Sequence, residues 1–186
     1  LGGTDSFAPS SSCIGIHEAA VPVGLFDIRD NILRNSMTNP ANPNPPTENR
    51  AYGIMITATV EAGAGIFSQL DYNDYYIDGY QGSIAHRYEP GAAGPWTIFT
   101  TLAEWQAYTG KESHTITDNP VFVSETDLHP TSYALNSAGQ FVINKDYSNV
   151  TRKNPPDMGA YEWNVLITDY HTLAATAITQ TTATLN

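Results

Sequence analysis

Apolar and polar residues alternate in two stretches of the first half of the chain, and the two stretches resemble each other. In the first, residues 15–17 are followed after a gap by residues 25–33, and in the second, residues 53–56 are followed by residues 67–76. Each begins with a Gly-Ile strand start and continues into an alternating strand that ends in asparagine. Alternation with a period of two predicts β-strands. A repeat of this kind cannot bury its apolar face alone, so we expect the two copies to stack.

Asparagine follows the alternating part of each copy, at Asn31 and Asn73. Asparagine tolerates the left-handed backbone conformation, so it predicts a corner there. Stacked corner asparagines can also hydrogen-bond to one another along a solenoid. In the first copy, alternation separates an apolar set from a polar set. The apolar set is Phe26, Ile28 and Ile32, and the polar set is Asp27, Arg29 and Asp30.

Two segments rich in proline, glycine or asparagine interrupt the strands. Residues 38–49 cannot be a strand or a helix interior, and they predict a loop that projects from one coil. This loop is either a plain surface loop or a ligand-contacting one. Residues 89–95 predict a second loop.

One helix is expected, over residues 101–110. Thr100 or Thr101 is its N-cap, Glu104 has the spacing of a capping box, and Gly110 provides a C-terminal stop. The sequence therefore predicts mostly strands with one short helix.

Composition agrees with a strand-rich protein. Only 15% of the residues are charged, and lysine plus arginine number 8. The net charge of −11 opposes binding to nucleic acids and docking on anionic lipid. No stretch is long enough to span a membrane, so we expect no membrane insertion. An acidic surface of this kind fits an extracellular protein, although acidity also simply aids solubility.

The chain has a single cysteine, Cys13, so no internal disulfide is possible. Cys13 lies in the apolar run 13–16, and we expect it to be a buried small hydrophobic residue. The chain opens without a basic, apolar signal segment, which favours a fragment of a longer protein.

Five landmarks occur in a characteristic order over most of the chain. They are residues 70–76, 102–110, 118–123, 127–130 and 156–163. In this order they resemble the C-terminal coils of pectate-lyase-like right-handed parallel β-helix proteins of bacterial surfaces. The resemblance implies an all-β fold, with residues 1–163 forming the last coils and C-terminal cap of a right-handed parallel β-helix. It also implies a protein that is secreted or held at a bacterial cell surface, with the last landmark closing the solenoid.

Residues 164–186 have a different character. They resemble a linker and the first strands of a fibronectin type III domain, truncated before its two sheets can close. Unfinished edge strands tend to pair, so self-association through these C-terminal strands is expected as one possibility.

Candidate glycan-binding residues come from both copies. Enzymes built on β-helices use carboxylates together with lysine or arginine in a groove, and aromatic rings stack on sugars. The candidates are Arg29, Asp30, Tyr72, Asp74 and Tyr76. Two alternatives remain open, a solvated ladder of polar side chains and, for about half of the tyrosines, core packing.

No cofactor is required by any motif. Three aspartates in the turn-rich part, Asp118, Asp127 and Asp157, are candidates for calcium, which accepts many oxygen ligands in flexible geometry. The alternative role for these aspartates is turn capping. The pattern of a catalytic zinc site is missing.

Three functions are compatible with these features. The first is a non-catalytic extracellular β-helix module of a larger secreted or surface protein, acting as an adhesin, stalk or glycan-contacting surface. The second is the C-terminal portion of a polysaccharide lyase or glycoside hydrolase whose catalytic residues lie mainly upstream. The third is a filament subunit assembled through its C-terminal strands. No catalytic residue is assigned, and the sequence does not name a polysaccharide.

Overall fold

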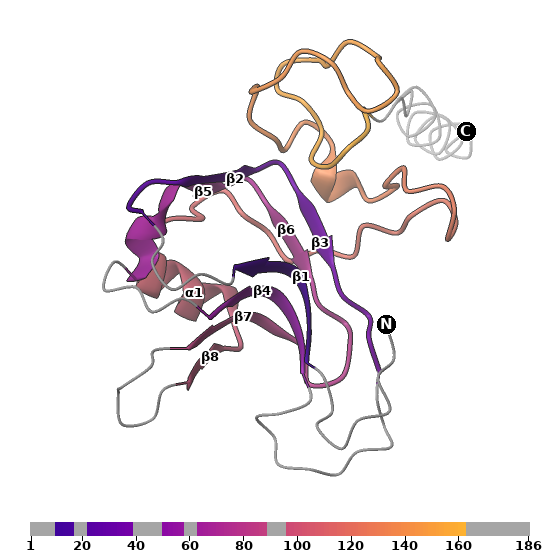
Figure 1. The fold of residues 1–186 in the computed structure, drawn as a ribbon. Helices are drawn as coiled ribbons and strands as arrows, with labels where there is room; N and C mark the ends of the chain where they lie inside the picture. The colour runs from indigo at the N-terminus through magenta and orange to yellow at the C-terminus, as the bar shows by residue number, and fades with distance from the viewer. Residues whose placement is uncertain (1–9, 17–21, 39–49, 58–62, 89–95, 163–186) are drawn as a thin grey trace, which may run out of the picture.

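The computed structural model in Figure 1 contains short strands arranged around one interior, which apolar side chains fill. It describes residues 10–16, 22–38, 50–57, 63–88 and 96–162. The strands are β1 (Ser11–Ile16), β2 (Phe26–Arg29), β3 (Ile32–Arg34), β4 (Ala51–Ile56), β5 (Phe67–Asp71), β6 (Asp74–Tyr76), β7 (Ser83–Tyr88) and β8 (Trp96–Phe99). The helical elements are α1 (Leu102–Thr109) and the 3₁₀ turns η1 (Gly63–Ile66) and η2 (Tyr133–Leu135). The regular structure of the described residues is mostly strand, with a single α-helix, which confirms the all-β prediction.

The strands pair in three sheets. β1, β4 and β7 are parallel neighbours, and β8 closes that sheet by pairing antiparallel with β7. β2 pairs with β5 and β3 pairs with β6, both in parallel. The registers place Ile28 beside Leu70 and Leu33 beside Tyr75. Each strand of the first stretch therefore lies on its counterpart in the second.

A corner divides each alternating segment into two strands. Asp30 has φ 59° and Tyr72 has φ 55°, so the left-handed residue is the one before each asparagine. The corners expected at Asn31 and Asn73 are therefore present, but the prediction that the asparagine itself is left-handed was wrong. The corner also changes which side chains face inward. Leu33 is buried in the core, whereas Ile32 faces the C-terminal segment.

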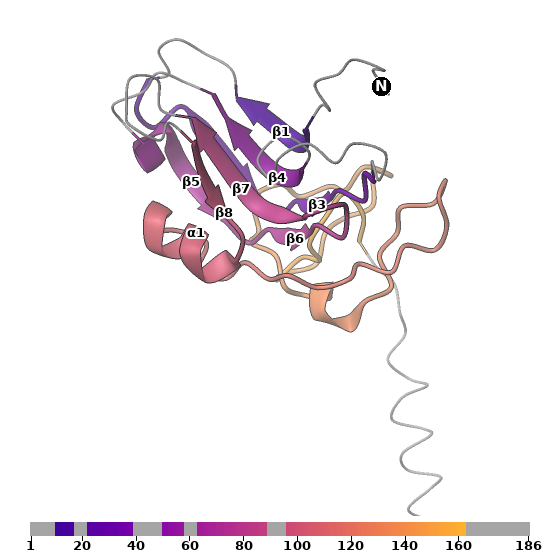
Figure 2. The same ribbon diagram turned by 90° about the horizontal axis from the view of Figure 1, so that it is seen from below.

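The core lies between the sheets and is closed on one side by α1. Its described members are Ile16, Leu33, Ile54, Ile56, Ile66, Phe67, Leu70, Tyr75, Ile84, Ala85, Phe99 and Trp105. Trp105 is fully buried and meets the rings of Phe67 and Phe99. Figure 2 shows α1 beside β5 and β8.

The predicted helix and both of its ends are confirmed. Thr101 and Glu104 form a capping box, and Gly110 ends the helix in the left-handed conformation with φ 64°. The apolar side of the helix supplies Trp105 to the core. The sequence signals at its ends and its buried face therefore agree.

Residues 120–162, here called the C-terminal segment, have little regular structure and lie against the corner between β2 and β3 (Figure 1). The backbone N–H of Gly159 donates to the carbonyl of Asp30 at 2.9 Å. Gly159 has φ 98°, and a Cβ there would lie 2.6 Å from Ile32 Cδ1, so a glycine permits this close approach. The landmark at residues 156–163 thus packs on the corner over its described part.

Several expectations change or fall outside the described residues. Cys13 is exposed on β1 instead of buried, because the side chains of Ile14 and Ile16 take the inward positions. The loop at 89–95, nearly all of the loop at 38–49, and the fibronectin-like strands at 164–186 lie outside the described residues. Among the described helices, none has the length and apolar character needed to cross a membrane.

Candidate functional site

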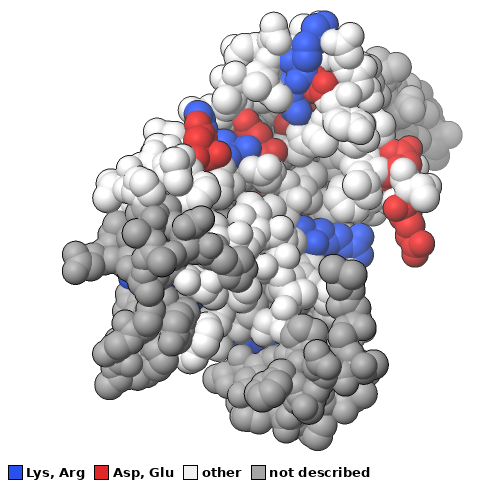
Figure 3. Space-filling model, in the orientation of Figure 1, with Lys and Arg blue, Asp and Glu red and all other residues white. Residues whose placement is uncertain are grey.

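An open groove lies between the β2–β3 corner and the C-terminal segment. Its volume is about 710 Å³. On the face that Figure 3 shows, most of the visible acidic and basic side chains lie over this upper part of the molecule. The lining residues are Asp27, Arg29, Asp30, Asn31, Ile32, Phe122, Leu128, Gln140, Val142, Ile143, Lys145, Asp146, Tyr147, Arg152, Gly159 and Ala160.

Arg29, the last residue of β2, joins the two walls of the groove. Its Nε and Nη2 donate to the carboxylate of Asp27 at 2.6 and 2.5 Å, and its Nη1 donates to Gln140 Oε1 at 2.7 Å. Hydrogen bonding to Arg29 lowers the pKa of Asp27. Two-pronged contact with a carboxylate holds a guanidinium in one orientation, so Arg29 presents a fixed edge to the groove.

Asp30 fastens the C-terminal segment to the corner. Its Oδ1 accepts from the backbone N–H of Gln140 at 2.6 Å, and its carbonyl accepts from Gly159. Burial raises the pKa of Asp30, although the bond from Gln140 and nearby arginines oppose that shift. Asp30 is therefore engaged chiefly in holding the groove together.

The far wall is built on Arg152 and Asp146. Arg152 is buried and donates to Glu162 Oε1 at 3.0 Å and to the carbonyl of Gly159 at 2.7 Å. Burial acts to raise the pKa of Asp146, but backbone donors such as Glu162 and Val150 lower it overall. Both side chains are thus engaged within the protein, while Arg152 Nε is buried without a hydrogen-bond partner among the described residues.

Apolar surface remains open in the groove. Tyr147 is 81% exposed, and Leu128, Val142 and Ile143 are also exposed. Tyr147 meets the ring of Tyr161 edge-on, with centroids 5.7 Å apart. An aromatic ring held by one edge leaves the rest of its surface available to a ligand.

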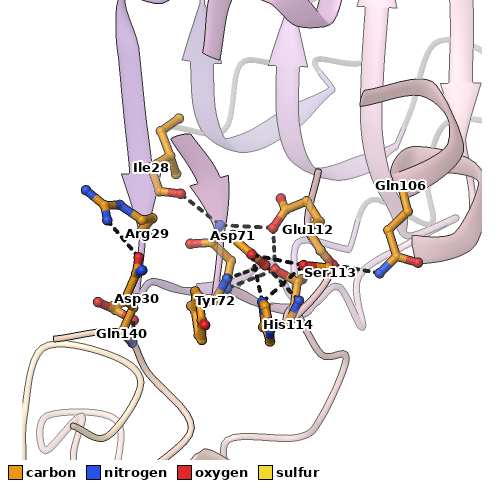
Figure 4. A network of polar contacts seen from close by, with 12 residues as sticks. Ile28, Arg29, Asp30, Asp71, Tyr72, Gln106, Glu112, Ser113, His114 and Gln140 are labelled. Atoms are coloured by element: carbon orange, nitrogen blue, oxygen red, sulfur yellow. Dashed lines mark hydrogen bonds and ion pairs between the residues drawn. The ribbon is translucent and has the colours of Figure 1, made fainter. Parts of the chain in front are cut away.

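A polar cluster lies one corner away, as Figure 4 shows. Tyr72 stacks on His114 with ring centroids 4.4 Å apart, and His114 Nδ1 lies 2.9 Å from Asp71 Oδ2. Ser113 Oγ lies 3.0 Å from the same Nδ1. A catalytic triad requires serine and aspartate on opposite ring nitrogens. The shared nitrogen excludes that arrangement, and the cluster stabilises the corner.

Beneath this corner lies the buried carboxyl of Glu112 (Figure 4). It accepts from Tyr75 Oη at 2.5 Å, from Asn73 Nδ2 at 3.2 Å and from Thr115 Oγ1. Burial raises the pKa of Glu112, and these donors oppose the shift. The site is closed to ligands and joins successive layers of strands.

The five candidate glycan residues do not form one cluster. Arg29 and Asp30 line the groove, and Tyr72 belongs to the neighbouring corner cluster. Tyr76 lies under the guanidinium of Arg34, which is 5.7 Å from its ring centroid. Asp74 is fully buried, so its carboxyl does not reach the groove. Its Oδ1 accepts from the backbone N–H of Asp118 at 2.8 Å, and burial raises its pKa to about 7.

The three calcium candidates each have separate partners. Asp118 accepts from Ser132, Asp127 Oδ1 lies 2.5 Å from His129 Nδ1, and buried Asp157 meets Lys153 Nζ at 2.6 Å. Within the described ranges, no group of three His, Cys, Asp or Glu side chains is placed to hold a metal ion. Calcium binding at these aspartates stays a prediction.

No protein-family model, curated protein or solved structure matched this chain.

Sequence reasoning missed half of the groove. Gln140, Lys145, Tyr147 and Arg152 come from irregular turns in which no periodicity marks an inward or outward face. Arg29 and Gln140 are 111 positions apart, so no local pattern connects them. The contact of His114 with Asp71 could not be predicted either, because the two residues are 43 positions apart.

Proposed function

We propose that the described residues are the last coils of a right-handed parallel β-helix and that the C-terminal segment is its cap. Three parallel strand pairings, each joining a strand to its counterpart in the next layer, support this proposal. The antiparallel pairing of β8 with β7 supports an end to the stack on that side. A secreted or surface-held protein, as the resemblance implies, belongs to the same proposal.

The function we propose is non-catalytic contact with a glycan in the groove, within a larger adhesin-like or stalk-like protein. The observation that carries it is the pairing of open apolar surface at Tyr147 with fixed polar groups at Arg29 and Asp27. Sugars present both hydroxyls and apolar ring faces. Fixed donors and acceptors suit the hydroxyls, and an exposed ring suits the faces.

The contacts that the groove carboxyls already make within the protein favour binding over catalysis. Asp27 is engaged by Arg29, Asp30 by the backbone of Gln140, and Asp146 by two backbone N–H groups. A glycosidase requires two carboxyls free to act on the bond that is cleaved. The carboxyls of Asp27, Asp30 and Asp146 are instead engaged in contacts within the protein.

One observation favours the alternative of a lyase or hydrolase. Asp27 and Asp30 both line the groove, and the pKa of Asp27 is lowered by Arg29 whereas burial raises the pKa of Asp30. Carboxyls of one site with opposite shifts are typical of an acid and a base. The filament alternative depends on residues 164–186, which lie outside the described residues.

The test is affinity electrophoresis of the chain through gels containing soluble polysaccharides, with parallel assays for shortened or unsaturated products. We expect retardation by at least one polysaccharide without product. Tyr147→Ala should abolish retardation, whereas Tyr133→Ala is a matched control, since Tyr133 is 72% exposed and does not line the groove. Product release, or equal behaviour of the two variants, would overturn the proposal.

A further inference from the structure

A second hollow adjoins the groove. It has a volume of about 740 Å³ and lies over the outward face of β3 and the residues after it. Its lining residues are Ile32, Arg34, Ser36, Phe122, Ser124, Glu125 and Leu128. Ile32, Phe122 and Leu128 line both hollows, so the two meet along an apolar boundary.

The joined hollows, here called the path, share an apolar boundary, and each has polar residues that the other lacks. Arg29 and Lys145 line only the groove, whereas Arg34 and Ser36 line only the second hollow. A compact ligand fills one hollow, whereas a chain of similar units can occupy both. The repeated alternation of hydroxyls and apolar faces along a linear polysaccharide matches such a path.

The charges along the path are balanced. The groove is lined by three basic and three acidic residues, and the second hollow by Arg34 and Glu125. The guanidinium of Arg29 is held by Asp27, and Arg34 Nη2 lies 3.6 Å from Asp78 Oδ2. No uncompensated cluster of cations is left for carboxylates of a ligand, and the net charge of −11 repels a polyanion.

Arg29 and Arg34, whose charges are balanced by aspartates, still suit a neutral ligand. A guanidinium has five N–H donors, and Arg29 uses three of them in its bonds to Asp27 and Gln140. Arg34 Cζ lies 5.9 Å from the ring centroid of Phe122 and 5.7 Å from that of Tyr76, so its guanidinium is held between two aromatic rings. The remaining N–H groups are directed by fixed side chains and can meet sugar hydroxyls.

We propose that the two hollows are one binding groove for a linear, neutral polysaccharide that spans both of them. This inference rests on the proposed glycan-contacting function and names the class of glycan. The inference predicts that neutral chains bind better than polyuronates, because of charge. It also predicts that long chains bind better than short ones, because they occupy both hollows.

The experiment uses the full chain and six probes: soluble glucan, mannan, xylan and galactan against polygalacturonate and alginate, each at low and high salt. Isothermal titration measures affinity. We expect binding to at least one neutral polymer with little salt dependence, because no net charge is neutralised. Binding to polyuronates that weakens with salt would overturn the inference and leave the proposed function standing. Failure of all six probes would overturn both.

Continuity of the path is tested with a blocking variant. Ser36 is exposed, has no hydrogen bond within the described residues, and lines only the second hollow, so Ser36→Trp fills that hollow without altering Arg29 or Tyr147. For a long neutral chain we expect a loss of affinity on the order of tenfold or more, as is usual when one of several subsites is removed.

Short oligomers of the same polymer should be affected less by this variant. Thr97→Trp on β8 is the matched control, because Thr97 is exposed and lines neither hollow. Circular dichroism establishes that both variants fold. Unchanged affinity of the Ser36 variant for long chains would show that the hollows act separately and would overturn the single groove.

Discussion

The side-chain amide nitrogen of Asn31 lies 3.1 Å from the amide oxygen of Asn73, 42 positions further along the chain. Asn73 in turn donates to the carbonyl of Ile28 at 3.0 Å and to Glu112 at 3.2 Å. Each asparagine follows a left-handed residue at a corner. The ladder therefore ties together three successive layers of the fold, and its inner members, Asn73 and Glu112, are fully buried.

Asn73→Ala should be strongly destabilising. The substitution removes side-chain hydrogen bonds to the carbonyl of Ile28, to the Glu112 carboxyl and from Asn31, although Glu112 keeps its other donors. The loss of these bonds at a fully buried side chain should cost about 2–4 kcal/mol in total. Urea denaturation followed by circular dichroism measures the change. Asn31→Ala is the matched control and should cost less, because Asn31 is only half-buried. Equal losses of stability in the two variants would contradict a larger contribution from Asn73.

The corner illustrates how far sequence reasoning reaches. Alternation and asparagine were enough to predict stacked strands and corners, because both depend on local backbone preferences. The exact left-handed positions, Asp30 and Tyr72, were missed. Their conformation is imposed by stacking of one layer on the next, and a residue such as tyrosine gives no local sign of it.

Only one wall of the groove could be predicted from the sequence. Arg29 and Asp30 belong to an alternating strand and its corner, so their outward direction followed from the pattern. Gln140 and Gly159 meet Asp30 through contacts between distant turns, which no periodicity encodes. Asp74 was expected at the surface, yet it is buried, because it lies on the side of the strands that Ile32 occupies and residues 116–118 pack over it.

Gly110→Ala should weaken the helix end without any steric clash. Gly110 has φ 64°, and no atom lies within 4 Å of the position a Cβ would take. The cost is thus the left-handed conformation itself, about 1 kcal/mol. Thermal unfolding measures the loss. Gly110→Asn should cost less than Gly110→Ala, since asparagine accepts this conformation more readily. A larger loss for Asn would contradict the assignment of the cost to the backbone.

Asp74 should make the protein less stable as pH rises. Its pKa is raised from 3.8 to about 7 by burial, so between these values the folded state holds a proton that the unfolded state has lost. The free energy of unfolding therefore falls with pH across this window, by about 1.4 kcal/mol per pH unit and up to about 4 kcal/mol in all, and then levels off. Asp74→Asn removes the titrating group.

The readout for Asp74→Asn is the pH dependence of unfolding relative to the unsubstituted protein. Near pH 3.8 the variant has no advantage and loses whatever its extra buried N–H group costs. Its relative stability should then increase steadily up to pH 7. A constant difference between the two proteins over this range would contradict a protonated, buried Asp74.

His86 should produce the opposite dependence. Its ring is stacked between Tyr52, with centroids 4.7 Å apart, and Trp96, at 4.6 Å. Burial, aided by the charge of Arg50, lowers the pKa of His86 from 6.5 to about 4. Between these values the unfolded state binds a proton that the folded state does not. The free energy of unfolding should therefore drop as pH falls from 6.5 to 4, by up to about 3 kcal/mol.

The variants His86→Phe and His86→Gln separate this effect from the loss of packing. Phenylalanine keeps a ring between Tyr52 and Trp96, glutamine does not, and neither titrates. Both should flatten the acid side of the stability curve to the same extent, although His86→Gln should be less stable at every pH because it loses the stacked ring. Urea denaturation over this pH range gives both quantities. If the acid slope persists in the two variants, another group is responsible for it, and the neutral, buried state of His86 is not what limits stability in acid.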